Sequence, residues 1–514
     1  NWSATGANGT FTLQWSNASN DTAVFGSTAG TVTLGTPITA GGLTFNTTGY
    51  VVTGSTLTLA GASAPIISVS AGTSTISSDI AGTNGLEKTG GSTTLILSGT
   101  NNTYSGTTTI SAGILQGNKS TPAGASPFGT STIQLNAGTQ LNSITISAND
   151  TPETYIFGND VNVGGSATID FRRSGGVGSA KTHAYGNLTI GNSTLSLTAA
   201  NINHTLSFTG GTLTGNAIIN NGTNATTNIG AITETGGPRT LTKQGVATLR
   251  LTGTNTYTGT TTISAGVLEV QGSIASSSGI INNSALTFNS GSAQSYGNVI
   301  SGSGSLTKLG VGTATLSGNN TFNGNVTVSA SGTLVLSGIN SYTGATNIGG
   351  GSSGGPGTLS VNSVSDYGVA SAIGAALSGA INFNPNANNF GTLIYTGSGG
   401  SMNRQFSIGT SGDSTVRNGA INNNGSGALI LTASQFNVTI TGTTVTRTLS
   451  LGGTYTGSAN EIQGVIQNNA AGGVINLTKN GASTWKLSGA NTYTGATSIS
   501  ANGGTLQFGK ASSL

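Results

Sequence analysis

The sequence predicts an all-β fold, a right-handed parallel β-helix (β-solenoid) of roughly twenty rungs. Three observations support this prediction. Helical periodicity is almost absent, short runs of alternating polar and apolar residues dominate the chain, and one long motif recurs along it. Because successive strands that stack on copies of themselves coil into a solenoid, the recurring motif favours this fold over antiparallel hairpins.

The strand pattern is visible in five short segments rich in Thr, Val, Ile and Leu: 31–34, 57–59, 132–135, 188–190 and 205–208. Asn-Gly pairs, for example at Asn84, Asn221 and Asn480, lie between such segments and fit turns that need positive φ. We therefore expect short strands separated by tight turns along the whole chain.

The motif occurs near residues 86–116, 241–270, 306–336 and 477–508, with a partial copy near 334–348. Its skeleton is L-x-K-x-G, then T-x-x-L-[ST]-G-x-N-x-[YF]-x-G, then a Thr-rich strand that ends in Ile or Val. One position of the second strand holds a set that only a solvent-facing site tolerates: Ile96, Arg250, Thr315 and Lys486. Since side chains alternate along a strand, its neighbours, such as Leu95 and Leu97, should point inward. Inward positions are also predicted in the third strand at Ile110, Ile263, Val328 and Ile499.

If a rung takes roughly 20–25 residues, a strand spacing of ~4.8 Å makes a rod roughly 100 Å long. We expect one continuous β-helix over residues 1–514, with an N-terminal cap within residues 1–30.

These motifs resemble the autotransporter-associated β-strand repeat, also called the passenger-associated transport repeat. The opening, with Trp2, Trp15, Ala23-Val24-Phe25 and the run 42–45, is similar to the start of such passengers. The resemblance implies a right-handed parallel β-helix, secretion across an outer membrane, and display on or release from the bacterial surface. It implies no particular ligand. It also implies contact with a membrane only through a translocator, which is absent from this sequence.

Composition and charge exclude several classes of site. Gly is 85 of 514 residues, the net charge is +3, and charged residues are 5% of the chain, against roughly 25% in a globular domain. Without Cys there is no disulfide or thiolate metal site. No basic cluster exceeds Arg172–Arg173, so we predict no nucleic-acid partner. His183 and His204 have no recognised metal spacing, and the Gly-x-Ser-x-Gly match at 351–355 lacks a following helix.

The acidic residues concentrate only between Asp150 and Asp170, and Arg172, Arg173, Lys181 and His183 follow directly. Neighbouring rungs could gather these groups on one face. We interpret them as a solvated patch, with a catalytic or glycan-binding groove as the alternative. We predict no catalytic, cofactor-binding or metal-binding residues and no cofactor.

The recurring lysines and tyrosines of the motif have two interpretations. Lys88, Lys243, Lys308 and Lys479 could form a basic stripe for an anionic glycan, but we expect each ammonium to bind turn carbonyls at a corner. Tyr104, Tyr257, Tyr342 and Tyr493 could stack on sugars, but their fixed place between Asn and Gly favours corner packing.

The predicted function is an extracellular structural or adhesive rod without catalysis, secreted or displayed on the bacterial cell surface. Two alternatives stay open. The first is a filament or sheath subunit whose partner is another copy of itself, stacked end to end, because the apolar segment 504–508 still has the pattern of a rung. The second is a protein that binds or cleaves host or matrix glycans.

Overall fold

The computed structural model describes residues 15–147, 149–175, 178–200, 202–349, 356–384, 389–409, 417–437, 445–468 and 472–509. All 51 regular elements in these ranges are β-strands, and all strand pairings between them are parallel. The predicted all-β parallel solenoid is confirmed. In the described ranges no helix is long and apolar enough to span a membrane.

The chain forms two compact units, residues 1–259 (unit 1) and 260–514 (unit 2). Each unit is a stack of parallel rungs in its own right. Continuity over residues 1–514 stays a prediction. Residues 1–14 of the predicted cap and the Gly-rich segment 351–355 lie outside the described residues. The first described strand of unit 1 begins at Thr22.

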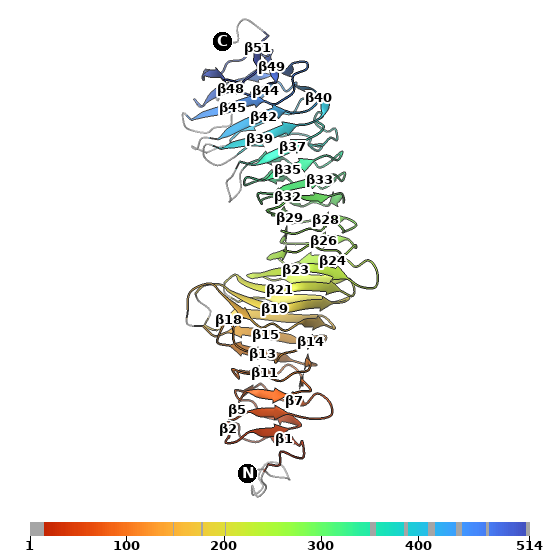
Figure 1. Cartoon of the computed structure of the whole chain (residues 1–514), viewed down its shortest axis with the longest axis vertical. Coiled ribbons are helices and arrows are strands. Elements are labelled where there is room, and N and C mark those ends of the chain that lie inside the picture. The colour runs from red at the N-terminus through yellow and green to blue at the C-terminus, as the bar shows by residue number, and fades with distance from the viewer. Residues whose placement is uncertain are drawn as a thin grey trace. The chain divides into compact units, whose positions relative to one another are not determined.

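Unit 1 has three sheets, which Figure 1 shows as stacked strands from β1 to β24. Sheet 1A contains β1 (Thr22–Phe25), β4 (Gly42–Phe45), β7 (Ile66–Val69), β10 (Leu86–Thr89), β12 (Thr108–Ile110), β14 (Ile133–Leu135), β16 (Glu153–Ile156), β17 (Val161–Val163), β19 (Lys181–Ile190), β21 (His204–Leu213), β23 (Ala225–Glu234) and β25 (Thr248–Leu251). Sheet 1B contains β2 (Thr31–Leu34), β5 (Val51–Gly54), β8 (Thr73–Ile76), β11 (Thr94–Leu97), β13 (Ile114–Lys119), β15 (Gln140–Thr145), β18 (Ala167–Arg173), β20 (Thr194–Thr198), β22 (Ala217–Asn221) and β24 (Leu241–Gln244). Sheet 1C contains β3 (Ile38–Ala40), β6 (Leu57–Leu59) and β9 (Ile80–Gly82).

Unit 2 has four sheets. Sheet 2A contains β27 (Val267–Val270), β29 (Ala285–Phe288), β32 (Ser305–Lys308), β34 (Val326–Val328), β36 (Thr346–Ile348), β38 (Ile381–Phe383), β41 (Phe406–Ile408), β44 (Gln435–Asn437) and β47 (Val465–Ile466). Sheet 2B contains β26 (Thr261–Ile263), β28 (Ile280–Asn282) and β31 (Ile300–Ser301). Sheet 2C contains β30 (Gln294–Tyr296), β33 (Thr313–Leu316), β35 (Thr333–Leu336), β37 (Thr358–Val361), β39 (Phe390–Tyr395), β42 (Asn418–Asn423), β45 (Thr446–Gly452), β48 (Val474–Lys479) and β50 (Thr497–Ile499). Sheet 2D contains β40 (Ser398–Met402), β43 (Gly427–Leu431), β46 (Asn460–Ile462), β49 (Thr484–Leu487) and β51 (Thr505–Phe508).

Each rung contributes a strand to sheet 1A in unit 1 or to sheet 2A in unit 2. Counted in this way, the described residues form roughly twenty rungs, as predicted. Rung length varies with position. In unit 2 the partners Leu286, Leu306 and Val326 follow one another at intervals of 20 residues. In unit 1 the partners Leu135 and Val163 are 28 residues apart. These longer rungs hold the predicted charge cluster.

The core lies inside the rungs, where alternate side chains of each strand meet. Leu95 and Leu97 are fully buried and Ile96 between them is not, as the sequence predicted. Ile110, Ile263 and Val328 are buried as well. Ile499 lies in register with the fully buried Lys479, as an inward position should, but its side chain is 55% exposed. Its strand, β50, pairs with β48 only, and no further described strand stacks on it.

Candidate functional site

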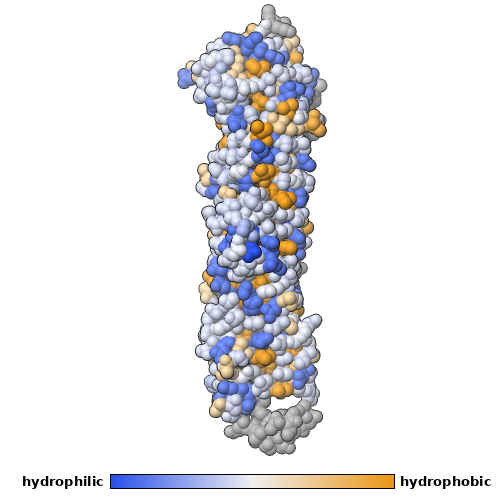
Figure 2. Space-filling model, turned by 90° about the vertical axis from the view of Figure 1, so that its right-hand side faces the viewer, coloured by the Kyte–Doolittle hydropathy of each residue, from blue (hydrophilic) through white to orange (hydrophobic). Residues whose placement is uncertain are grey.

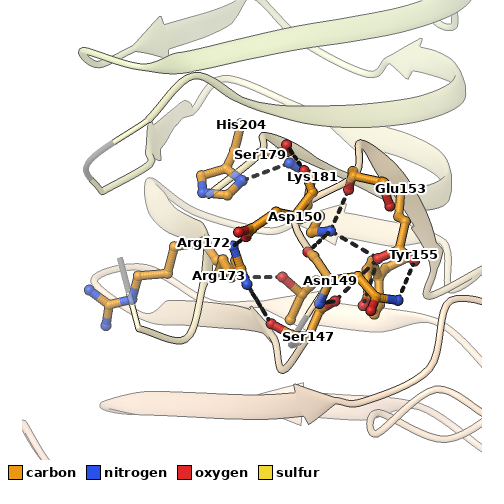
Figure 3. Close-up of polar contacts among 12 residues, drawn as sticks. Ser147, Asn149, Asp150, Glu153, Tyr155, Arg172, Arg173, Ser179, Lys181 and His204 are labelled. Carbon is orange, nitrogen blue, oxygen red and sulfur yellow. Dashed lines mark hydrogen bonds and ion pairs between the residues drawn. The ribbon is translucent and has the colours of Figure 1, made fainter. Parts of the chain in front are cut away.

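The predicted charge cluster assembles where the rungs of unit 1 are widest. Strands β19, β21 and β23 have ten residues each, whereas most strands of the motif have three or four. The first half of β19 pairs with β16, and Glu153 lies in register with Lys181. This pairing brings together side chains that are about thirty residues apart in the sequence (Figure 3).

Lys181 is buried beneath a loop that we call the pinned loop (Ser147 and residues 149–153). Its ammonium donates hydrogen bonds to the main-chain oxygens of Asn149, at 3.0 Å, and Thr151, at 2.6 Å. It also forms an ion pair of 2.9 Å with the carboxylate of Glu153. The hydrogen bond from Lys181 holds the pKa of Glu153 below its usual value. The loop is therefore fixed from inside by one buried cation (Figure 3).

Arg173 is a second cation that holds the same loop. Its guanidinium donates two hydrogen bonds to the main-chain oxygen of Ser147, at 3.0 and 2.8 Å, and one of 2.8 Å to Asp150. The Arg173 side chain is only 9% exposed, whereas the Asp150 side chain is 76% exposed. Both carboxylates of the pinned loop thus form an ion pair with a buried cation.

The two histidines lie in the core behind the loop. His183 is fully buried, its Nδ1 lies 3.0 Å from the hydroxyl of Ser143, and its ring stacks on Phe157. Burial, together with the neighbouring His204, lowers the pKa of His183 to about 3. His204 accepts a hydrogen bond from the main-chain nitrogen of Lys181, and burial lowers its pKa as well. The described residues contain no group of three His, Cys, Asp or Glu side chains that could hold a metal ion.

The other predicted members of the cluster lie apart from the pinned loop. Asp170 is on the outer side of sheet 1B, because its neighbours Ile169 and Phe171 are buried in the core. Its Oδ2 lies 3.5 Å from Arg172, its Oδ1 has no hydrogen-bond partner, and burial raises its pKa. Asp160 instead accepts a hydrogen bond from the main chain of Asn187. The structure thus separates Asp160, Asp170 and Arg172 from the charged side chains that hold the pinned loop.

The four motif lysines are buried, and the basic stripe considered above is wrong. The ammonium of Lys88 donates to the oxygens of Thr89, at 2.8 Å, and Gly90, at 3.2 Å, and to Ala112 of the next rung, at 3.2 Å. Lys479 repeats this geometry with Asn480, Gly481 and Gly503. Burial lowers the pKa of Lys88, Lys243, Lys308 and Lys479 to about 8. Each such group of turn carbonyls is called a lysine cage below.

The lysine cage explains one glycine of the motif. In the third copy, a Cβ atom on Gly332 would lie 2.5 Å from the ammonium of Lys308 and would overlap the main-chain oxygen of Gly310. The ammonium itself hydrogen-bonds to Gly310. The turn of the following rung must therefore approach the lysine without a side chain, which only glycine allows.

The motif tyrosines pack at corners, and Tyr104, Tyr257 and Tyr342 are too deeply buried to stack on a sugar. The hydroxyl of Tyr104 lies 2.9 Å from that of Thr108, and the hydroxyl of Tyr342 lies 3.1 Å from that of Thr346. Phe322 stacks on Tyr342 with ring centroids 5.3 Å apart. Phe322 occupies the position of the motif tyrosine in the third copy, so the tyrosine hydroxyl is dispensable there. Tyr493, in the final copy, is half-buried.

Sequence reasoning missed three further buried cations. Arg404 donates hydrogen bonds to the main-chain oxygens of Ile373 and Gly374, and Arg447 donates one to Ile408. Lys119 binds the main-chain oxygens of Gly124 and Ala125. None of these three residues lies in the motif copies, so no repeated pattern marked them. In both units, buried cations thus donate their hydrogen bonds to main-chain carbonyl oxygens.

Figure 2 shows a mostly pale, weakly polar face with separate blue and orange groups. The largest exposed apolar side chains of unit 2 include Val311, Ile339 and Leu377. A small cavity of unit 1 is lined mainly by aliphatic side chains, among them Leu188 and Ile219, and none of its lining residues is titratable.

Comparison with known proteins confirms the resemblance. The model of the passenger-associated-transport-repeat matches residues 86–116, 241–270, 306–330, 331–352 and 477–508. It thus places a boundary at 330/331, where the copies near 306–336 and 334–348 were predicted to overlap. The chain is similar to the "Adhesin BmaC autotransporter" of Brucella suis biovar 1 (strain 1330), with 52% identity over 129 residues. This segment is 25% of the chain and 4% of the adhesin's length. No solved structure matches the chain.

Proposed function

We propose that this chain is part of a bacterial passenger that is secreted or displayed at the cell surface, where it acts as an adhesive and structural β-solenoid without catalysis. The observation that carries the proposal is the set of five transport-repeat matches, together with the segment that is 52% identical to an autotransporter adhesin.

The chemistry of the described residues supports a role without catalysis. Hydrolysis of a glycosidic bond usually requires a pair of carboxyl groups, one of them protonated, on either side of the bond. Here Asp150 and Glu153 are each paired with a cation. Asp170 lies on another face, beside Arg172. The four motif lysines and three of the four motif tyrosines are buried and stabilise the packing of the rungs.

A surface role also fits the distribution of charge. Eight of the fourteen described Lys and Arg residues are buried: Lys88, Lys119, Lys181, Lys243, Lys308, Lys479, Arg404 and Arg447. Few Lys and Arg side chains, after which trypsin-like proteases cleave, are therefore accessible. The backbone of each rung is also hydrogen-bonded to the backbone of the neighbouring rungs. A chain of this kind resists degradation outside the cell.

The test is direct. Antibodies raised against the purified chain should label intact bacteria that carry the gene, and beads coated with the chain should bind host cells above albumin-coated beads. Absence of surface labelling, together with bead binding no better than albumin, would refute the proposal. Electron microscopy of the same preparation separates the filament alternative, since continuous fibres would identify a polymer subunit.

A further inference from the structure

A buried lysine, a glutamate and an asparagine meet at the pinned loop. The two oxygens of the Glu153 carboxylate bind two different nitrogens. Its Oε2 lies 2.9 Å from the ammonium of Lys181, and its Oε1 accepts a hydrogen bond of 3.4 Å from the side-chain amide of Asn149. The same ammonium donates to the main-chain oxygen of Asn149 at 3.0 Å. An amine, a carboxylate and a carboxamide are thus gathered in one place (Figure 3).

The fold keeps these three groups together. Glu153 on β16 is in register with Lys181 on β19, so the pairing of the strands places the carboxylate beside the ammonium. The Lys181 side chain is 0% exposed, and its ammonium is also held by the main-chain oxygen of Thr151. Groups that are held in contact react far faster than groups that must meet by diffusion.

The three groups are the components of an amide transfer. A lysine amine can attack the Cγ atom of an asparagine side chain, and the Nδ2 atom then leaves as ammonia. Such a reaction needs a group that removes protons from the amine and supplies them to the departing nitrogen. Because the hydrogen bond from Lys181 holds the pKa of Glu153 below its usual value, Glu153 is ionised at neutral pH and can accept a proton. It contacts both nitrogens between which the protons must pass.

We propose that Lys181 and Asn149 become joined by an intramolecular isopeptide bond, and that Glu153 transfers the protons. Glu153 takes a proton from the ammonium, and Nζ of Lys181 forms a bond to Cγ of Asn149. Glu153 returns the proton to Nδ2 as the Cγ–Nδ2 bond breaks. A second proton of Nζ follows, so an ammonium ion leaves and no external reactant is consumed. Each chain reacts once, so the bond is a modification of the chain and involves no turnover.

The surroundings fit both the departure of ammonia and the stability of the product. Asn149 is exposed, so the released ammonium can diffuse into the solvent, whereas the nitrogen of the new bond stays buried. The bond links the pinned loop to β19 covalently. Since the chain has no cysteine, a disulfide cannot supply such a link.

The test is mass spectrometry of the full chain, incubated at neutral pH until its mass no longer changes. Loss of ammonia should place this mass about 17 Da below the value expected from the sequence. Trypsin does not cleave after a lysine whose Nζ is acylated. The digest should therefore contain a branched peptide that joins residues 120–172 to residues 174–239. Fragmentation of this peptide should locate the branch at Asn149 and Lys181.

Two variants test the roles of the side chains. Asn149→Ala removes the reacting amide but keeps the main-chain oxygen that binds Lys181, so the loop remains held. Glu153→Gln keeps the size of the side chain and removes the group that accepts protons. The branched peptide should be absent from Asn149→Ala and reduced at least tenfold in Glu153→Gln.

Lys486→Met is the matched control. The ammonium of Lys486 lies 3.0 Å from Glu461, and the same carboxylate accepts a hydrogen bond of 3.2 Å from the amide of Gln463. The partners are thus of the same kind, but the Lys486 side chain is 41% exposed and belongs to unit 2. Lys486→Met should contain the branched peptide of residues 149 and 181 in the same amount as wild type.

Three results would overturn the proposal. The first is a wild-type mass equal to the value expected from the sequence. The second is a mass about 17 Da lower with linear peptides only, which a succinimide ring at an Asn-Gly pair would give. The third is an undiminished branched peptide in Glu153→Gln. The first two results are obtained with the wild type, so they count even if a variant fails to fold.

Discussion

The lysine cage makes a pH-dependent prediction that can be worked out for Lys88. We consider Lys88→Met, which keeps the length of the side chain and removes the charge. At neutral pH two effects oppose each other. The carbonyl oxygens of Thr89, Gly90 and Ala112 lose their ammonium partner, and buried unpaired groups cost about 1–3 kcal/mol. The burial of a charged ammonium is removed at the same time, which offsets this loss.

The pH dependence is clearer than the neutral-pH difference. Burial lowers the pKa of Lys88 from 10.5 to about 8 in the folded protein. Between these two values the unfolded chain binds more protons than the folded chain, so the stability of the wild type rises with pH. Since one pKa unit corresponds to about 1.4 kcal/mol, the full gain is roughly 3 kcal/mol between pH 8 and 10.5. Lys88→Met lacks this gain.

The assay is urea-induced unfolding followed by far-UV circular dichroism at pH 7.0, 8.5 and 10.0. The difference in unfolding free energy between wild type and Lys88→Met should shift in favour of the wild type by about 2 kcal/mol over this range. Ile110→Val, a buried change without a titrating group, should keep a constant difference from wild type. A Lys88→Met difference that is equally constant would refute the lysine-cage reasoning.

Three further predictions concern other parts of the chain. Lys181→Met should expose the pinned loop, so that a non-specific protease cleaves residues 149–153 at least tenfold faster than in wild type, as peptide mapping would show. Gly332→Ala should destabilise unit 2 by about 2 kcal/mol or more in urea unfolding, since the new methyl overlaps the lysine cage of Lys308, whereas Gly291→Ala, which meets nothing within 4 Å, should be neutral. Because five buried lysines have pKa values of about 8, isoelectric focusing of the native chain should give a value about one unit below the 9.1 expected from sequence, and focusing in urea should restore it.

The fold could be predicted from the sequence because the repeats act as an internal comparison. Ile96, Arg250, Thr315 and Lys486 occupy one position, and only a solvent-facing site accepts all four. The same comparison revealed the lysine cage, since a charge that recurs in a chain otherwise poor in charge must have a structural partner.

The polar sites were harder to predict, for a physical reason. Lys181 binds Asn149 and Glu153 only because β19 continues for ten residues and pairs with β16. That pairing depends on the length of the rungs between them, which no repeat in this part of the chain specifies. Arg404 and Arg447 show the same limit, since their partners are main-chain oxygens and have no signature in the sequence.

Leu286, Leu306 and Val326 follow one another at a constant interval of 20 residues. The number of rungs in this part of unit 2 can therefore change by one complete rung at a time. Removal of residues 307–326 would join Leu306 to Thr327, the residue in register with Thr307, so that every later side chain keeps its inward or outward direction. An insertion of the same length would have the same property. Recombination between such segments can therefore lengthen or shorten a protein by one strand spacing, about 4.8 Å, without redesign of its core.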